Sequence, residues 1–395
     1  MFSLDNFYYI LYANLLKPAN LYSLYFYPFG STSSDNICQD FSSIRPMWND
    51  NIHHHCLYYD QEPLIKQHFE KLNFQQKFHM FFTYKYCKIL ANSEHSLIKK
   101  QICKENGYID WYYFFHGFAA LDWYRDFQYF PSVEYQITKI FISLNRLTTK
   151  DRSYRLLLAS HLINEDLIEK GHVSLGLDDM GLGTWQDELV YKDTKLPTHT
   201  IPFIREQISK LPGSLTLDQT NPQGDLSSKF DQHSIRINKE ALWHVVTETV
   251  FYYDKLHLTE KIFKPIVHQR PFILVAAPGN LAYLKSYGFK TFDRWIDESY
   301  DNEQDPAKRI EMVVAELKKL CQLSMTEINQ MYQEMKEVLD YNFNHFYGKF
   351  KTIIANELVD NFEGSVQQWN NGRVDGRTID ISHIDLDKIK RLLGQ

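Results

Sequence analysis

The sequence has 395 residues, 44% hydrophobic and 23% charged, a composition typical of a globular protein long enough for two domains. Its formal net charge is −6, so it lacks the basic surplus by which dedicated duplex-DNA binders replace counterions along phosphates. Five cysteines without a C-x-x-C pair argue against a disulfide framework and favour the cytoplasm, and without a run of about 18 apolar residues we expect no transmembrane segment.

The N-terminal part alternates apolar runs with polar or helical segments. The run 56–59 is a predicted strand that ends before Pro63, because polar residues and a proline do not continue it. Two further strands are predicted at 87–91 and 111–115, with a helix at 96–105 between them. Strands that alternate with helices predict a parallel sheet with both faces covered.

A second α/β domain is predicted after a linker. Residues 125–137 have the proline and serine content of a connecting segment. An apolar strand at 139–144 follows, then the pair Asn145-Arg146 and a predicted helix at 152–163. This strand–loop–helix order is the usual opening of an α/β domain.

The stretch 241–290 has the clearest pattern in the chain. Its predicted elements are a strand at 242–251 that carries Glu248, a helix at 259–268, a strand at 272–276 and a helix at 281–287. Residues 176–230, which precede it, are rich in Gly, Asp, Thr and Pro and predict mostly loops and turns.

The C-terminal third is predicted to be helical. Asp305-Pro306 matches an N-cap and first helical position, and Ser324 with Glu327 matches a capping box. We therefore expect three parts: an N-terminal α/β domain at 1–130, a C-terminal α/β domain at 138–345, and a helical segment and tail at 346–395.

Polar residues of the stretch 241–290 suit a nucleoside diphosphate. Ligands of an open parallel sheet lie beyond the carboxyl ends of its strands, toward which Glu248 is expected to lie. Thr259, Glu260 and Lys261 are expected at a helix start, where free N–H groups and the helix dipole favour phosphate. Lys261 adds a positive charge, and Glu260 can accept hydrogen bonds from ribose hydroxyls. The alternative is that Glu260 only caps its helix and Lys261 is solvated.

Two loops complete the predicted diphosphate site. Gly279-Asn280 opens another helix beside it. Asn145-Arg146 follows the first strand of the second domain, where Arg146 could neutralise a leaving diphosphate without a metal. The alternative for Arg146 is an ordinary surface arginine.

The segment 257–265, with Glu248 before it and 270–274 after it, resembles the donor-site signature of the alpha-1,3-fucosyltransferase family. That family has a Glu at a strand end, then a Thr-Glu-Lys helix start, here 259–261, and then a buried strand. The resemblance implies a GT-B fold, with two Rossmann-like lobes whose parallel sheets face a central cleft, plus C-terminal helices. It also implies a metal-independent, inverting enzyme that uses GDP-fucose, with donor contacts from Glu248, Glu260 and Lys261.

The expected activity is glycosyl transfer from a nucleoside-diphosphate sugar to an acceptor hydroxyl, by a hexosyl- or fucosyltransferase-like enzyme. Thr249 stands where the family has Asn, so the resemblance favours a distant viral or bacterial branch and leaves the sugar open. The expected acceptor is a glycan or glycolipid. Two alternatives remain: a viral enzyme of the host cytoplasm that glycosylates a hydroxylated DNA base, and a non-catalytic nucleotide- or sugar-binding protein.

The catalytic base is expected in the N-terminal domain. Glu62 is preferred, because the fucosyltransferase base also follows a strand of that domain, and Asp60 lies two residues before it. His116 follows a later strand and is a rival, since the ordinary pKa of histidine is about 6.5. Asp122 and Trp123 are expected on the acceptor side.

No metal site or cofactor is expected, apart from the nucleotide sugar as co-substrate. Asp385-Leu386-Asp387 has the spacing of a metal-binding Asp-x-Asp motif but no convincing strand–loop context. The adjacent histidines 53–55 would point to alternate faces of a strand.

Overall fold

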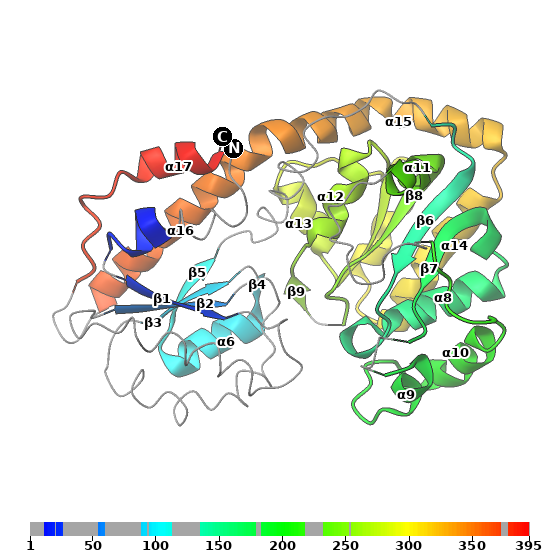
Figure 1. Cartoon of the computed structure of the whole chain (residues 1–395), viewed down its shortest axis with the longest axis horizontal. Helices are drawn as coiled ribbons and strands as arrows, with labels where there is room; N and C mark the ends of the chain where they lie inside the picture. Colours follow the sequence, from blue (N-terminus) through cyan, green and yellow to red (C-terminus); the bar gives the residue numbers. More distant parts are fainter. Residues whose placement is uncertain are drawn as a thin grey trace. The chain divides into compact units, whose positions relative to one another are not determined.

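The computed structural model describes residues 12–19, 21–26, 54–59, 88–92, 95–112, 135–178, 183–217, 232–252, 254–372 and 378–394. The chain divides into two compact units (Figure 1). The first unit comprises residues 1–125 and 349–395, and the second comprises residues 126–348. The protein is a mixed α/β chain with parallel sheets and C-terminal helices, as the alternation of strands and helices predicts.

A four-stranded parallel sheet forms the centre of the first unit. Its strands in spatial order are β1 (Leu21–Phe26), β2 (His54–Tyr59), β3 (Lys88–Asn92) and β5 (Ile109–Tyr112). Strands were predicted at the last three of these positions, with bounds that differ by a few residues, whereas β1 was not predicted.

Helices from both ends of the chain complete this unit. They are η1 (Tyr12–Leu16), α6 (Leu97–Asn106), α16 (Lys351–Gly372) and α17 (Leu386–Gly394), with the short strand β4 (His95–Ser96) before α6. Ser96 caps α6 by accepting a hydrogen bond from the Lys99 amide at 3.0 Å. Figure 1 shows α6 and α16 on opposite faces of the sheet. The C-terminal segment, which we expected as a separate part, thus belongs to the first unit.

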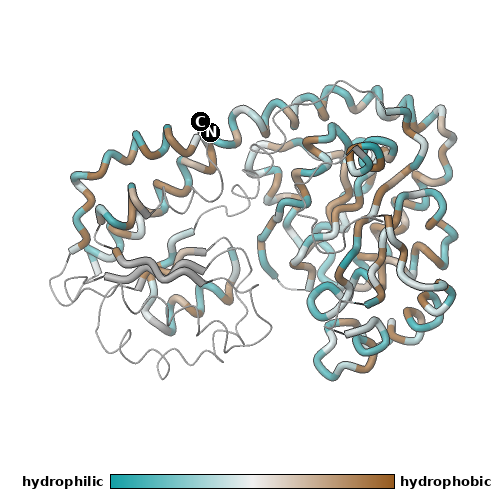
Figure 2. Tube along the Cα trace, in the orientation of Figure 1, coloured by the Kyte–Doolittle hydropathy of each residue, from teal (hydrophilic) through white to brown (hydrophobic). Residues whose placement is uncertain are grey.

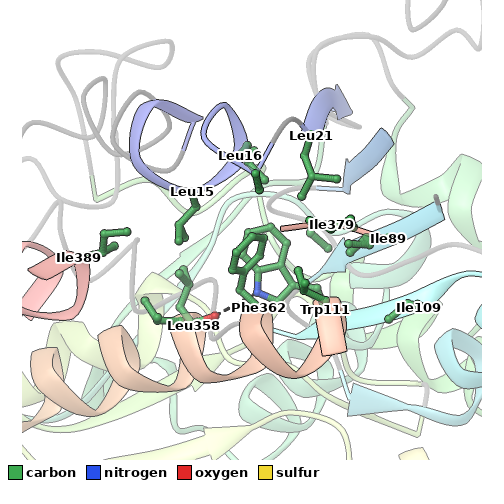
Figure 3. Packing of buried hydrophobic residues seen from close by; sticks show 14 residues of the cluster. Leu15, Leu16, Leu21, Ile89, Ile109, Trp111, Leu358, Phe362, Ile379 and Ile389 are labelled. Carbon is green, nitrogen blue, oxygen red and sulfur yellow. Dashed lines mark hydrogen bonds between the residues drawn. The ribbon is translucent and has the colours of Figure 1, made fainter. Parts of the chain in front are cut away.

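The core of the first unit joins residues from distant parts of the sequence (Figure 3). Trp111 on β5 is fully buried and lies 5.0 Å, centroid to centroid, from Phe362 on α16. Its indole N–H donates a hydrogen bond to the Leu358 carbonyl at 3.1 Å. Leu15 and Ile389 pack in the same cluster, so both ends of the chain contribute to one core.

The sheet of the second unit is also parallel and four-stranded. Its strands in spatial order are β10 (Phe272–Val275), β8 (Ala241–Thr247), β6 (Lys139–Asn145) and β7 (Gly171–Leu175). Every residue of β8 and β10 is buried, which explains their continuous apolar sequences. Figure 2 shows hydrophobic residues gathered along these central strands.

Helices surround this sheet. They are α8 (Tyr154–Asn164), α9 (Trp185–Val190), α10 (Ile201–Ile208), α11 (Gln232–Glu240), α12 (Glu260–Val267), α13 (Asn280–Ser286), α14 (Pro306–Cys321) and α15 (Met325–His345). Shorter elements are η3 (Lys150–Arg152), η4 (Ile168–Lys170), η5 (Thr198–Thr200), β9 (Lys255–Leu256), η6 (Glu298–Asn302) and η7 (Phe346–Phe350). Among the described residues, no helix has the length and apolarity needed to cross a membrane.

Predictions at helix starts are confirmed, and one strand of the second unit is shorter than predicted. Asp305 caps α14, and Ser324 with Glu327 forms the capping box of α15. The strand predicted at 242–251 ends at Thr247, so Glu248 lies just beyond it. In the stretch 176–230, predicted to be mostly loops and turns, the described residues include the short helices α9 and α10.

Two histidines are buried together in this unit. His244 on β8 is 4% exposed, and its Nε2–H donates to the Asn238 carbonyl at 3.0 Å. Burial lowers the pKa of His244 to about 3, with a further lowering from the nearby Arg270. His268, whose ring centroid lies 6.3 Å away, also has a pKa far below its usual value, mainly because of burial. Both rings are therefore neutral in the folded protein at neutral pH.

Burial of the neutral His244 side chain should make the free energy of unfolding depend on pH. Because the folded-state pKa of His244 lies below its unfolded value of about 6.5, its contribution is present above pH 6.5 and is lost as the pH falls toward about 3. We expect the stability advantage of the wild type over His244→Gln to shrink by about 2 kcal/mol between pH 6.5 and 4.5. Urea unfolding at several pH values measures this difference. The exposed His233→Gln is the control, and an equal pH slope in all three proteins would contradict the prediction.

Candidate functional site

The candidate site lies at the carboxyl ends of β6 and β8, the two central strands of the second unit. The chain leaves β6 through α8 to reach β7, and leaves β8 through α12 to reach β10 on the other side of the sheet. This is a topological switch point, where the loops after adjacent strands diverge and open parallel sheets bind their ligands. Asn145 and Glu248 lie there, as predicted from the strand ends.

Glu248 is the first residue after β8, and its side chain is completely buried. Its two carboxylate oxygens accept hydrogen bonds from the Thr259 amide at 3.1 Å and the Thr259 hydroxyl at 2.5 Å. Burial raises the pKa of Glu248, while the charge of Lys261 and the bonds from Thr259 oppose that rise. Glu248 was predicted to contact the donor, but in the structure its carboxylate faces the start of α12.

The start of α12 carries the accessible polar groups of the site. Thr259 is the N-cap, and its hydroxyl oxygen accepts hydrogen bonds from the Lys261 amide and from Lys261 Nζ, both at 3.2 Å. Lys261 Nζ also lies 2.8 Å from Glu260 Oε1. The side chains of Lys261 and Glu260 are 33% and 23% exposed, so both can be reached from solvent.

The predicted pair Asn145-Arg146 separates into a buried and an exposed residue. Asn145 is 1% exposed, and its amide side chain donates to Ser143 Oγ at 2.9 Å and accepts from Thr247 Oγ1 at 2.8 Å. It therefore ties β6 to β8. Arg146 is exposed at the same edge.

The second predicted helix start, at Gly279-Asn280, is occupied by the protein itself. The Asp301 carboxylate accepts from the amides of Leu281 and Ala282 at 3.0 and 3.2 Å. Asn280 is fully buried, and its side chain bonds the His257 amide and the Lys255 carbonyl, each at 2.8 Å. Asn280 thus braces the loop before α12, whereas a direct contact with the donor was predicted for it.

The first turn of α8 holds the site together and was missed in the sequence analysis. Arg155 is 4% exposed and donates to the carbonyls of Leu147 and Thr247, both at 2.9 Å. The Tyr154 hydroxyl donates to the Glu248 carbonyl at 2.5 Å. One signal was present in the sequence, since an arginine within an apolar helix face needs buried acceptors.

Aromatic residues fix the loop after β8. Phe251 stacks on Tyr154 with ring centroids 4.0 Å apart and an interplanar angle of 13°. The Tyr252 and Ser153 hydroxyls lie 3.0 Å apart. Arg309 from α14 donates to the Phe251 carbonyl at 2.7 Å and lies over its ring at 4.1 Å. The loop that carries Glu248 is therefore anchored before any ligand binds.

Other predicted site residues lie outside the part of the chain that the structure describes. They are Asp60, Glu62, His116, Asp122 and Trp123. Asp385, from the Asp-x-Asp pattern, accepts from the Lys388 amide at 2.8 Å at the start of α17. Within the described residues, no group of three or more His, Cys, Asp or Glu side chains could hold a metal ion.

The arrangement combines an exposed arginine, a capped helix start with a lysine, and a carboxylate that can accept from hydroxyls. A helix N-terminus and a lysine favour a phosphate, and the neighbouring carboxylate of Glu260 suits a polyhydroxylated group.

No protein-family model matches this chain, and no curated protein or solved structure matches it at a significant level.

A close approach of two backbones shapes the loop after β6. The Gly176 amide donates to the Asn145 carbonyl at 2.8 Å. A Cβ at Gly176 would lie 1.9 Å from the carbonyl oxygen of Arg146, a distance that no side chain permits. Gly213, in contrast, has open space where a Cβ would be.

Gly176→Ala should therefore destabilise the protein by about 1–3 kcal/mol, because the loop must move to admit a methyl group. Gly213→Ala is the matched control and should change the free energy of unfolding by no more than about 0.5 kcal/mol. Chemical denaturation of both variants measures the difference. Equal stabilities would show that the two loops do not approach this closely in solution.

Proposed function

We propose that this protein is a glycosyltransferase that uses a nucleoside-diphosphate sugar, with its donor site at the carboxyl ends of β6 and β8 and the start of α12. One observation carries the proposal: Glu248, Thr259 and Lys261 form a continuous hydrogen-bonded chain at the topological switch point of the sheet. The same residues carry the resemblance to the alpha-1,3-fucosyltransferase family. Geometry and resemblance thus point to one site.

The diphosphate of the donor is proposed to bind at the N-terminus of α12. Lys261 and Arg146 supply positive charge, and the helix dipole adds to it. Negative charge on the leaving diphosphate grows as the glycosidic bond breaks, so these groups stabilise the transition state more than the bound donor. Glu260 accepts hydrogen bonds from the ribose hydroxyls.

The proposed reaction is a single inverting displacement. The acceptor hydroxyl oxygen attacks the anomeric carbon as the bond from that carbon to the diphosphate breaks, and the hydroxyl proton passes to a base of the first unit. Glu62 is the proposed base, with Asp60 and His116 as rivals and with Asp122 and Trp123 near the acceptor. A GT-B arrangement of the two α/β units would bring base and donor together, and a four-stranded parallel sheet in each unit supports it.

The proposed acceptor is a glycan or glycolipid, since the net charge of −6 disfavours duplex DNA. The cytoplasm is the proposed compartment. Cys103 is a buried free thiol and Cys321 a half-buried one, which is compatible with a reducing environment.

The proposed donor site is tested by the binding of nucleoside diphosphates to the wild type and to variants of Glu260, Lys261 and Lys264. A nucleotide at 100 times its dissociation constant should stabilise the wild type by about 2.7 kcal/mol, which a thermal-shift screen of GDP and UDP with their sugars detects. Glu260→Ala should weaken binding, and Lys261→Ala should slow turnover about 10- to 100-fold, more than it weakens binding.

Lys264→Ala is the matched control, because it removes the same charge from the last turn of α12. It should keep wild-type affinity and turnover. The proposal fails if no nucleotide stabilises the wild type, or if Lys264→Ala and Lys261→Ala have equal effects.

The base is tested by Glu62→Gln and His116→Ala. Glu62→Gln should bind the nucleotide sugar normally and transfer it about 10²- to 10⁴-fold more slowly, the usual contribution of general-base assistance. Slow hydrolysis of the donor without acceptor, followed in the wild type, separates an enzyme from a binding protein. Near-normal transfer by Glu62→Gln together with an inactive His116→Ala that still binds donor would assign the base to His116.

A further inference from the structure

We infer that Glu248 is a positioning residue, which orients the hydroxyl of Thr259 and through it the amine of Lys261, and that Glu248 itself does not touch the nucleotide. The inference rests on the proposed function for the identity of the ligand. The hydrogen bonds between the three side chains are present in the protein without ligand, so they can be tested separately from the proposed function.

The hydrogen-bond capacity of Thr259 supports this connection. A threonine hydroxyl has one proton to donate and two lone pairs to accept with. The Thr259 hydroxyl donates its proton to Glu248 Oε2 and accepts from the Lys261 amide and Lys261 Nζ. The donor and both acceptor lone pairs of the hydroxyl are thus used, and the Glu248 carboxylate fixes the orientation of the hydroxyl proton.

The burial of Glu248 excludes direct contact with a ligand in this conformation. The residue has no exposed surface, and each of its carboxylate oxygens already accepts from Thr259. Thr259 is 3% exposed, whereas the Lys261 side chain is 33% exposed. The three residues therefore lead from the interior to the surface, and Lys261 is the member that a ligand can reach.

The backbone of Glu248 is held independently of its side chain. Its amide donates to the Val275 carbonyl at 3.0 Å, and its carbonyl accepts from the Tyr154 hydroxyl. A change of the side chain to Gln should therefore leave the loop in place. The new amide group would donate to Thr259 Oγ1, so that only one lone pair would remain for the two Lys261 groups.

The stability of the fold does not explain why residue 248 has a carboxylate side chain. Burial raises the pKa of Glu248, so its stabilising contribution is present at low pH and is lost as the pH rises through the folded-state value. The charged form of the side chain thus lowers stability relative to a neutral one. Glu248→Gln should keep or exceed the wild-type melting temperature at pH 8, while the orientation of Lys261 deteriorates.

Glu298 provides a matched control within the same unit. Its carboxylate also accepts from a threonine hydroxyl, Thr291 at 2.8 Å, and from a backbone amide, Phe292 at 2.7 Å, and it lies 3.0 Å from a lysine amine, Lys285 Nζ. Glu298→Gln therefore makes the same chemical change outside the proposed site.

The first experiment needs no ligand. Acylation of the Lys261 amine by a limiting amount of reagent is followed by peptide mass spectrometry in the folded full-length protein. Glu248→Gln and Thr259→Val should each accelerate it about threefold to tenfold, the range that corresponds to one lost hydrogen bond. Glu298→Gln should leave the Lys261 rate unchanged, and Thr259→Ser, which keeps the hydroxyl, should restore it. Unchanged rates in Glu248→Gln and Thr259→Val would overturn the inference.

The second experiment is a double-mutant cycle on binding of GDP and of inorganic pyrophosphate. If Glu248 acts through Thr259, Glu248→Gln should weaken binding about tenfold in the wild type and cause almost no further loss in Thr259→Val. Additive losses would mean that Glu248 contacts the ligand directly and would overturn the inference. If the wild type binds neither probe, the proposed function fails, while the acylation rates still decide whether Glu248 positions Lys261.

Discussion

The carboxyl ends of the two central strands in the second unit are held together by one turn of helix α8. The Arg155 guanidinium bonds the carbonyls after β6 and at the end of β8, and the neighbouring Tyr154 hydroxyl bonds the carbonyl of Glu248. These carbonyls face a switch point, where no adjacent strand continues to pair with them. Because the buried Arg155 guanidinium bonds both carbonyls, it fixes the distance between the loop after β6 and the loop after β8.

A buried carboxylate beside this clamp is costly, and the surrounding groups show how the cost is limited. Glu248 lies at the N-terminus of α12, where the helix dipole favours negative charge, and it accepts two hydrogen bonds from Thr259. The Lys261 amine donates a hydrogen bond to the hydroxyl of Thr259. Burial of a charged group at one place in a fold is characteristic of functional sites, because the rest of the structure must stabilise it. The fully buried β8 and β10 provide that support.

The sequence predicted the elements with strong periodicity or caps, and it correctly placed Asn145 and Glu248 at the carboxyl ends of strands. It did not predict β7, α9 or α10, because these are short and lie among polar residues. It also did not predict how each polar residue would be used. Asn145, Asn280 and Glu248 have the residue types of ligand-binding groups, but all three are buried and bond the protein itself. Local sequence shows which residues can accept or donate, whereas the partner that each one finds depends on the neighbouring strand or loop.

The sequence predicts two helix starts beside the candidate site, those of α12 and α13. They differ in the carboxylates that accept hydrogen bonds from them. At α13, Asp301 accepts from two first-turn amides, so the charge that a phosphate would bring is already present there. At α12, the buried Glu248 carboxylate accepts from the amide and hydroxyl of the cap residue Thr259, and the first-turn amide of Lys261 donates to the neutral Thr259 hydroxyl. The accessible charges there are those of Lys261 and Glu260, whose side chains form an ion pair. An incoming diphosphate would repel Asp301 at the first site, whereas at the second it can replace Glu260 as the partner of Lys261. Glu260 Oε1, which in the free protein lies 2.8 Å from Lys261 Nζ, could then accept a hydrogen bond from a ribose hydroxyl.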